Sequence, residues 1–416
     1  MSPQLETQKH LQGLAPYAEN VYHQVCRACA ADAQSTSCIL AYFEILHRPW
    51  NVQGGKNMSN QQHVDQAKSD AFAHHMLGML NHAALSLMLS IGQKTRLFDT
   101  MSSMVPSTSE QIASAAGLQE RYVREWLAAL VTGRVIEYDA VQGTYRLPAE
   151  HAAWLTRDAG INNLAFQAQY LVMLASVQEE IVECFARGGG VSYASFPDFQ
   201  RLMAEESMHV VDSSLLQVTL PLIPGLTERL QAGIDVADIG CGSGHALNLM
   251  AQAFPRSRFA GYDFSQEGIA AAQEEARRLG LANTRFEVRD VSRLDAPDHY
   301  DFITTFDAIH DQARPAEVLK AIAKALRPGG VFLMVDIRAS SLLEENMEHP
   351  LAPFLYTISC NHCMTVSLAG EGAGLGTMWG EQVACQMLRD AGFTDVEVKH
   401  VEDDIMKSFY IASRSV

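Results

Sequence analysis

The sequence predicts an α/β protein in which a domain of alternating strands and helices follows a mainly helical N-terminal half. Three observations lead to this prediction. From Ile234 to Val416, short apolar runs alternate with helical patterns, the order that gives a parallel sheet covered by helices. Glycines cluster directly after the first of these runs. Between Gln61 and Leu230, apolar residues recur instead at helical spacing.

Length and composition set broad limits on the function. The 416 residues suggest about two or three domains, and the net charge of −17 argues against a nucleic-acid partner. Eight cysteines in so long a chain do not resemble a secreted disulfide framework, and no signal peptide is expected. The longest apolar run, Leu164–Val177, is interrupted by Gln167 and Gln169, so no membrane partner is expected. We expect a soluble cytoplasmic protein.

Residues 1–57 are expected to form a helical N-terminal extension and are the least informative part of the chain. Cys26 and Cys29 form a C-x-x-C pair. A metal or redox role would need partner residues that the neighbouring sequence does not supply. Two small apolar residues one helical turn apart are the favoured interpretation.

Residues 58–157 are predicted to be a winged-helix and dimerisation domain. The helical pattern Gln61–Ile91 is apolar around much of its circumference, as expected for a helix buried between subunits, and predicts a homodimer. Capping residues at Ser107–Glu110 begin two short helices, Gln111–Ala116 and Glu120–Leu130. Two strands follow, at 135–138 and 144–147.

A DNA-binding helix-turn-helix would show much the same pattern. The second helix, however, carries only Arg121 and Arg124, each with Glu120 or Glu125 nearby. DNA binding is therefore the weaker alternative for this domain.

Residues 158–230 are predicted to be a helical linker that contributes to the substrate cleft. Gly188–Gly190 suggests a hinge, followed by aromatic residues. Tyr193, Phe196 and His209 are candidate substrate contacts, and ordinary packing between domains remains the alternative for each.

Residues 231–416 are predicted to be the cofactor-binding domain. The first strand, Ile234–Ile239, runs into Gly240, Gly242 and Gly244, and Asp238 lies near its end. Glycines let a turn bring backbone N–H groups close to a ligand, and a helix N-terminus follows them. The second strand ends in Asp263, whose carboxylate suits a ribose diol. An ordinary Rossmann-like turn that binds NAD, or nothing, is the alternative.

The D-x-G-C-G-S-G motif followed by Asp263 resembles motifs I and II of class I S-adenosylmethionine (SAM) methyltransferases. This resemblance implies a Rossmann-like seven-stranded sheet, SAM as cofactor, S-adenosylhomocysteine as product and no metal. It also implies that Asp263 holds the ribose hydroxyls with Phe264 beside it. The adenine and methionine ends would be closed by Asp290, Val291, Phe306 and Asp307.

His310 is the candidate general base. It follows the fourth predicted strand, 300–306, at the edge where α/β sheets bind ligands, and imidazole titrates near neutral pH. Residues 58–416 resemble winged-helix methyltransferases of the caffeate and bacterial polyketide O-methyltransferase type, whose His-Asp-Trp motif falls on His310-Asp311. This chain has Gln312 in place of the tryptophan. The alternative for His310 is a structural or capping histidine.

About forty residues, the insertion 339–379, separate the fifth strand from the next helix and are predicted to be a lid. Its stretch from His362 and Cys363 through Met364 to Trp379 is similar to a bacterial group of winged-helix methyltransferases, some of which methylate hydrogen sulfide and methanethiol. A lid of soft, apolar side chains suits a small thiol, so His362 and Cys363 are catalytic candidates, and Met364 and Trp379 are candidate acceptor contacts. A buried structural loop is the alternative for each residue. Cys360, His362 and Cys363 could instead be half of a zinc site.

The sequence therefore predicts a SAM-dependent methyltransferase of a small-molecule acceptor, with a small thiol favoured. Methylation of a phenolic, hydroxyl or carboxylate oxygen is the first alternative. A SAM- or DNA-binding regulator that uses the winged helix is the second.

Overall fold

The computed structural model describes residues 64–402 and 404–414. The predicted extension 1–57, with Cys26 and Cys29, lies outside the described residues. The chain divides into two compact units, Met1–Ala71 and Phe72–Val416. All of the predicted site residues belong to the second unit.

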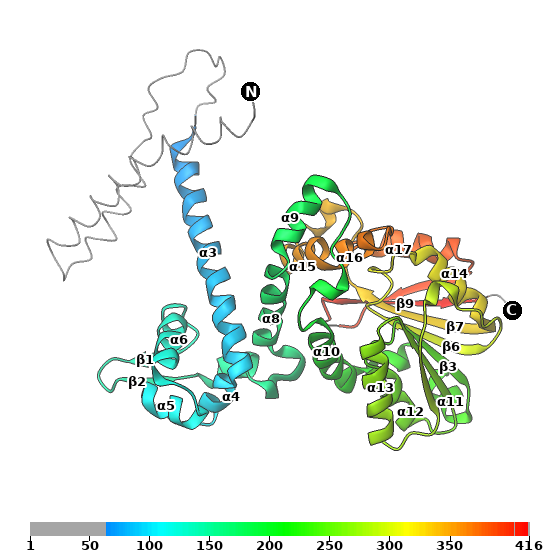
Figure 1. Cartoon of the computed structure of the whole chain (residues 1–416), viewed down its shortest axis with the longest axis horizontal. Helices are drawn as coiled ribbons and strands as arrows, with labels where there is room; N and C mark the ends of the chain where they lie inside the picture. Colours follow the sequence, from blue (N-terminus) through cyan, green and yellow to red (C-terminus); the bar gives the residue numbers. More distant parts are fainter. Residues whose placement is uncertain (1–63, 403, 415–416) are drawn as a thin grey trace, which may run out of the picture. The chain divides into compact units, whose positions relative to one another are not determined.

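The first part of this second unit has the predicted winged-helix elements (Figure 1). Thr108 begins α5 with a capping box, because its side chain accepts from the Gln111 N–H and the Gln111 side chain accepts from the Thr108 N–H. The Trp126 indole donates to the Met88 carbonyl at 2.8 Å and so fixes α6 against α3. The elements are α3 (Gln66–Thr95), α4 (Leu97–Ser102), α5 (Ser109–Ala116), α6 (Glu120–Thr132), β1 (Glu137–Asp139) and β2 (Thr144–Arg146).

The predicted linker is helical. It contains α7 (Ala149–Leu155), η1 (Arg157–Asn162), α8 (Leu164–Ala175), α9 (Gln178–Arg187), η2 (Tyr193–Ser195), α10 (Phe199–Ser214), the π-helix η3 (Leu215–Thr219), η4 (Leu220–Leu222) and α11 (Leu226–Ala232).

The last glycine of the predicted Gly188–Gly190 hinge makes a packing contact. A Cβ atom on Gly190 would lie 1.9 Å from the Thr365 carbonyl oxygen, so this position requires glycine. The next residue, Val191, donates its N–H to the Thr365 hydroxyl at 2.8 Å. Gly190 and Val191 are thus held against the lid, whereas Gly188 and Gly189 have positive φ and open space around them, and the hinge there stays a prediction.

The second part of the unit is the predicted α/β domain with one mixed seven-stranded sheet. The strand order is β5-β4-β3-β6-β7-β9-β8, and only β9 runs antiparallel to its neighbours, so that β8 and β9 form a C-terminal hairpin. The third strand of the domain ends at Val288, so Asp290 and Val291 lie just beyond it. The strands are β3 (Asp235–Ile239), β4 (Arg258–Asp263), β5 (Thr284–Val288), β6 (Tyr300–Phe306), β7 (Leu326–Ile337), β8 (Asp395–Lys399) and β9 (Lys407–Ser413).

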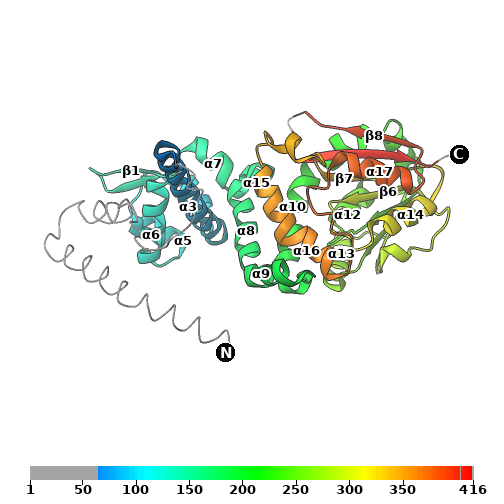
Figure 2. The same cartoon turned by 90° about the horizontal axis from the view of Figure 1, so that it is seen from above.

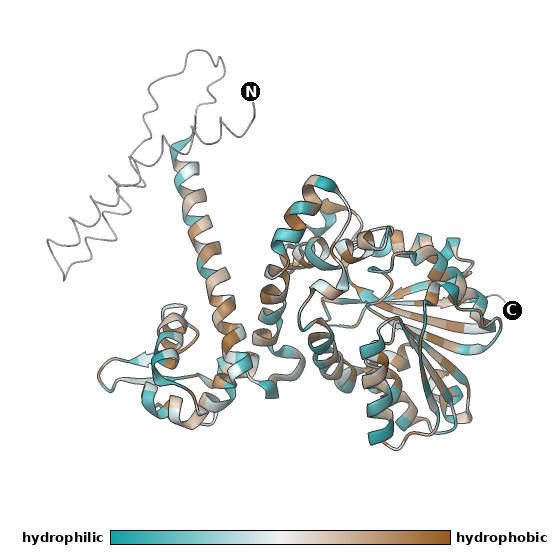
Figure 3. Ribbon diagram, in the orientation of Figure 1, coloured by the Kyte–Doolittle hydropathy of each residue, from teal (hydrophilic) through white to brown (hydrophobic). Residues whose placement is uncertain are grey.

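Helices cover both faces of this sheet (Figures 1 and 2). Alternate residues of β3 enter opposite cores: Val236 packs with α12 and α13, and Ala237 packs with α14 and α17. This burial on both faces explains why the strands appear as nearly continuous apolar runs, coloured brown inside the domain in Figure 3. The helices are α12 (His245–Ala253), α13 (Gln266–Arg278), α14 (Pro315–Ala325) and α17 (Gly380–Asp390), with the short η5 (Val291–Arg293) between β5 and β6.

The lid insertion folds into short helices instead of a loop. These are η6 (Leu343–Asn346), α15 (Ala352–Ile358), the π-helix η7 (Ser359–Cys363) and α16 (Met364–Ala369). Val366 of α16 shares a core with Phe166 and Tyr170 of α8, so the lid packs on the linker helices. Short π-helices such as η7 are rare and are found often at functional sites.

Among the described residues, no single helix combines the length and hydropathy of a membrane span. One pair, Phe199–Leu222 with Leu226–Ala232, meets the criterion only jointly and is bent by 104°.

Candidate functional site

The glycine loop after β3 has the backbone that its sequence predicts. Gly240, Gly242 and Gly244 all have positive φ, a conformation that favours glycine. A Cβ atom on Gly240 would lie 2.6 Å from the Ala308 Cβ atom, whereas a Cβ atom on Gly242 would meet open space. The loop is therefore packed closely beneath and open at Gly242, as a backbone cradle for a ligand must be.

Asp263 lies at the end of β4 and holds this loop. Its carboxylate accepts from the Gly242 N–H at 2.9 Å and from the Ser265 N–H at 2.7 Å. Burial raises the pKa of Asp263, although these backbone donors act in the opposite direction. Asp238 is buried beside it, and the Thr304 hydroxyl donates to its carboxyl group at 2.8 Å. Burial raises the pKa of Asp238 to about 7.

The remaining predicted cofactor residues lie at the ends of neighbouring strands. Phe264 follows Asp263, is 54% exposed and has its ring 5.2 Å from that of Tyr193. Asp290 caps η5 by accepting from the Ser292 N–H at 3.0 Å, and Val291 is buried. Phe306 is the last residue of β6, and Asp307 follows it with a positive φ. The structure thus brings these positions to the carboxyl edge of the sheet.

His310 is buried and committed to a carboxylate that the sequence did not single out. Its Nδ1 lies 2.7 Å from Asp336 Oδ1 at the end of β7. Burial lowers the pKa of His310, but the negative charge of Asp336, followed by the influence of Cys363, outweighs it and raises the pKa well above the ordinary value. With Nδ1 taken, only Nε2 can exchange a proton with a substrate.

Cys363 and His362 come to this histidine from the lid. The Cys363 thiol is buried near enough to His310 to contribute to its raised pKa, and its Sγ lies 3.6 Å from His362 Nδ1. The His362 ring stacks on Phe199 at 4.3 Å and meets Phe196 and Tyr193 edge-on at 4.6 and 5.4 Å. Burial, with His310 as a second cause, lowers the pKa of His362 to about 3, so this ring is neutral.

The predicted substrate contacts lie in three places. Tyr193, Phe196 and Met364 lie in or beside the lid. Tyr193 also hydrogen-bonds to Asp311, the residue after His310. His209 lies farther along α10, with its ring 6.3 Å from that of Phe166.

Trp379 is different. It is buried in the core between the sheet, α14 and α17, and its contact with an acceptor stays a prediction.

A second polar cluster, which sequence reasoning missed, adjoins His310. Lys407 of β9 pairs with Asp307, and Tyr170 of α8 donates to Glu206 of α10. Burial raises the pKa of Tyr170 well above its usual value, with Glu206 as the second cause and Asp307 and Cys363 as further causes. These groups therefore lie close to one another. No sequence motif connects them, because they come from four separate segments: α8, α10, the residue after β6, and β9.

The glycine loop fits SAM through the open space at Gly242 and the buried carboxylate of Asp263. The N–H groups of Gly240 and Cys241 are bonded to the Tyr262 carbonyl, and that of Gly242 is bonded to Asp263. Within residues 64–402 and 404–414, no three His, Cys, Asp or Glu side chains are grouped so that they could hold a metal ion.

Comparison with known proteins identifies both halves of the second unit. Residues 83–157 match the family model of the Rv2258c-like winged HTH domain, and residues 230–378 match that of a methyltransferase domain.

Two curated relatives align with part of the chain. The erythromycin 3''-O-methyltransferase of Saccharopolyspora erythraea is 29% identical over 184 residues, 43% of this chain and 56% of the relative. The fatty-acid O-methyltransferase of Mycolicibacterium smegmatis is 32% identical over 107 residues, 26% of this chain and 38% of the relative. The chain therefore spans about half, or less, of the length of these relatives.

Solved structures share the fold over nearly their whole length. Mitomycin 7-O-methyltransferase superposes with a TM-score of 0.62 at 18% identity, covering 84% of this chain and 99% of that one. Human N-acetylserotonin methyltransferase in complex with SAM superposes with a TM-score of 0.60 at 17% identity, covering 87% and 100%.

Proposed function

Because the chain carries an Rv2258c-like winged HTH domain followed by a methyltransferase domain, we propose that it transfers a methyl group from SAM to a small-molecule acceptor. The observation that carries this proposal is the position of His310. It is fixed by Asp336 at the carboxyl edge of the sheet, between the glycine loop and the lid.

The glycine loop and Asp263 would hold the cofactor. The open space at Gly242 leaves room for the ligand beside the loop, and the Asp263 carboxylate suits the ribose hydroxyls. SAM supplies an electrophilic methyl group on a sulfonium. Phe264 would lie beside the adenosine, and Asp307 near the methionine end.

His310 would accept the acceptor's proton at Nε2. Asp336 holds Nδ1 and thereby fixes the tautomer and the ring orientation. Because Asp336 also raises the pKa of His310, the imidazole is a stronger base once it is neutral. Loss of this proton to Nε2 would leave the acceptor atom with the electron pair that it needs to attack a methyl group. SAM, when bound, would supply that methyl group and leave as S-adenosylhomocysteine when its sulfonium–methyl bond breaks.

A small thiol is the acceptor that we favour. Thiols have pKa values near 8.5, close enough to a raised histidine pKa for one base to suffice. Gln312 donates to the Ala308 carbonyl at 2.9 Å, in the position where the caffeate-type enzymes have a tryptophan.

Oxygen methylation is the second candidate. It is favoured by the curated relatives and by mitomycin 7-O-methyltransferase, all of which are named as O-methyltransferases.

An acceptor panel separates the two candidates. The protein is incubated with SAM and sulfide, methanethiol, catechols or carboxylic acids, and S-adenosylhomocysteine is measured. We expect kcat/KM for a thiol to exceed that for every oxygen acceptor by about tenfold or more, the discrimination available from about 1.4 kcal/mol. A faster catechol or carboxylate would replace the thiol proposal with the second candidate.

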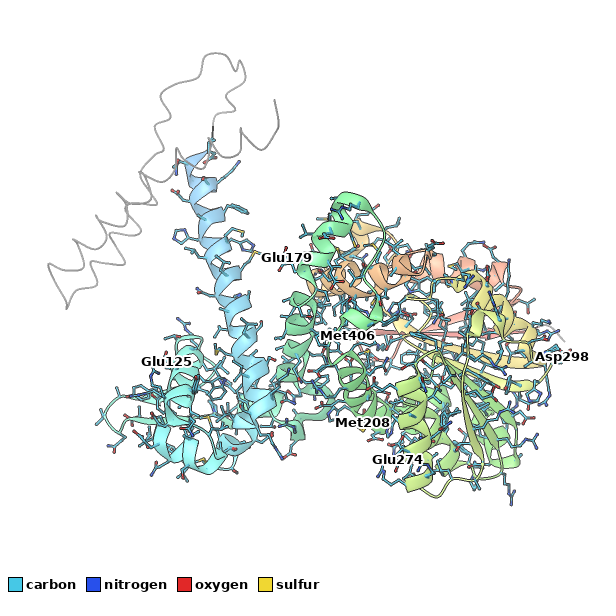
Figure 4. All side chains as sticks on the ribbon, viewed as in Figure 1. Glu125, Glu179, Met208, Glu274, Asp298 and Met406 are labelled. Carbon is cyan, nitrogen blue, oxygen red and sulfur yellow. The ribbon has the colours of Figure 1, made fainter. Side chains whose placement is uncertain are left out.

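DNA binding by the winged helix is the remaining alternative. Arg121 pairs with Glu125, and Arg124 pairs with Glu120. Glu125 is exposed on α6 (Figure 4). We therefore expect no shift of bulk DNA at low salt in an electrophoretic assay. A shift at micromolar protein would favour the regulator.

A further inference from the structure

Carboxyl groups dominate the region around His310. Asp336 forms a hydrogen bond with His310, and Asp311 follows His310 in sequence. Asp307 and Glu206 lie near Tyr170, as does Cys363. Lys407 lies near Asp336 and Glu206, and it is already paired with Asp307. The region around His310 is therefore negatively charged when His310 is neutral, the form in which it can act as a base.

Two of these carboxylates have an oxygen without a partner. Asp336 is fully buried, and its Oδ2 has no hydrogen-bond partner in the described part of the chain. The same holds for the buried Asp307 Oδ1. Buried carboxylate oxygens without partners favour a neighbouring hydrogen-bond donor and oppose a further anion.

We propose that the acceptor site selects neutral or cationic acceptors and rejects acceptors that carry a carboxylate or phosphate close to the reacting atom. The inference rests on the proposed function, because it places the acceptor beside His310. It narrows the acceptor class, because it excludes the carboxylate acceptors that remained as an alternative.

The test uses acceptors of equal shape and different charge. Mercaptoacetate and mercaptoacetamide differ only in a carboxylate against an amide, and 2-aminoethanethiol and propanethiol differ only in an ammonium against a methyl group. Initial rates are measured from pH 6 to 9, so that differences in thiol ionisation are separated from binding. We expect kcat/KM for mercaptoacetamide to exceed that for mercaptoacetate by at least about 100-fold. The ammonium compound should be used at least as well as propanethiol.

Binding provides a readout that does not require turnover. Calorimetric titration of the protein saturated with S-adenosylhomocysteine should detect the amide and give much weaker binding for the carboxylate. If the anion binds as tightly as its isostere, or if neither readout separates the pair, the inference is wrong. If the isosteres separate in binding but no thiol is methylated, the thiol proposal fails while the charge preference stands.

A pair of adjacent glutamates on α10 supplies the matched variants. Glu206→Gln removes a charge from the cleft while keeping the shape that contacts Tyr170 and Gln167. It should reduce the preference for the amide over the carboxylate by about tenfold. Glu205→Gln changes a residue that pairs with Arg201 outside the cleft and should leave the preference unchanged. If Glu206→Gln has a normal melting temperature and the same preference for the amide over the carboxylate as wild type, Glu206 is not part of the acceptor site.

Discussion

At the scale of single residues, the Nδ1 atom of His310 is committed to Asp336, and Cys363 lies near the ring. Its catalytic competence therefore depends on its protonation state. The His362 ring, although adjacent, is neutral and enclosed by aromatic rings, which suits it for packing against the acceptor rather than for carrying a proton. His362 and Cys363 of the lid thus differ from His310 in their chemical role.

His310→Ala should lower kcat by about 10²–10⁴-fold, the usual contribution of a positioned base. The loss should shrink as pH rises toward the acceptor's own pKa, because solvent then supplies the anion. SAM affinity, measured by calorimetry, should be nearly unchanged. His299→Ala, which changes an exposed histidine beside Tyr300, is the control and should keep full activity. Full activity of His310→Ala from pH 6 to 9 would exclude the base assignment.

Asp336→Asn should shift the pH profile of kcat/KM. The carboxylate raises the pKa of His310, so the acidic limb of the wild-type profile should lie above the ordinary histidine range near 6.5. Removing the charge lowers that pKa, and the limb should move to lower pH. The rate on the plateau should fall by about tenfold or more, because the ring loses its orienting partner. An acidic limb at the wild-type pH would mean that Asp336 is only structural.

Asp238 should make stability depend on pH. Its folded-state pKa is raised from 3.8 to about 7, so folding favours the protonated form, and stability should fall as pH rises through this window. Asp238→Asn keeps an oxygen for the Thr304 hydroxyl and carries no charge. The free energy of unfolding of the variant minus that of wild type should therefore increase as the pH rises from about 4 to 7, by roughly 1–3 kcal/mol in total. Urea titrations at several pH values measure this, and a difference that does not change with pH would contradict it.

At the scale of elements, the strands were predictable and the lid helices were not. Runs such as 234–239 and 300–306 are apolar because both faces of the sheet are covered, and that signal survives in the sequence. In the lid, a π-turn interrupts the helical period between α15 and α16, and glycines follow. No single 3.6-residue pattern therefore runs through it.

Gly190→Ala tests the contact between the linker and the lid. The new methyl group would clash with the backbone of α16, which cannot move without displacing Cys363 and His362. We expect a loss of about 2 kcal/mol or more in stability and a raised KM for the acceptor. Gly78→Ala is the control, since a Cβ there meets nothing within 4 Å, and it should stabilise α3 by about 0.5–1 kcal/mol. Equal melting temperatures for Gly190→Ala and wild type would contradict the contact.

At the scale of the whole molecule, the site is assembled from segments far apart in sequence. His310 and the glycine loop were identifiable because each is marked by a local motif at a strand end. Asp336, Glu206 and Lys407 carry no such motif. Asp336 became a partner of His310 only through the pairing of β6 with β7, and Lys407 reaches Asp307 only because β9 is inserted next to β7. Such partners require the strand order, which the sequence does not state.

The same scale includes the predicted homodimer. One face of α3 packs on the winged helix through Leu85, Met88 and Leu89, whereas another remains exposed (Figure 3). Phe72 is 64% exposed, Leu80 63% and Met79 51%. An apolar stripe of this kind is costly in water unless another surface covers it, and a second copy of the chain is the partner that every preparation contains.

Leu80→Lys should therefore weaken or abolish the dimer, because it places a charge in the centre of the stripe where a self-complementary interface would bury it twice. Val105→Lys changes an equally apolar and more exposed residue, 78% accessible, that lies outside α3, and it should leave the dimer intact. Light scattering across a concentration series measures both variants against wild type. A wild-type mass of one chain, 45.7 kDa, at micromolar concentration would exclude the dimer and leave the stripe without this explanation.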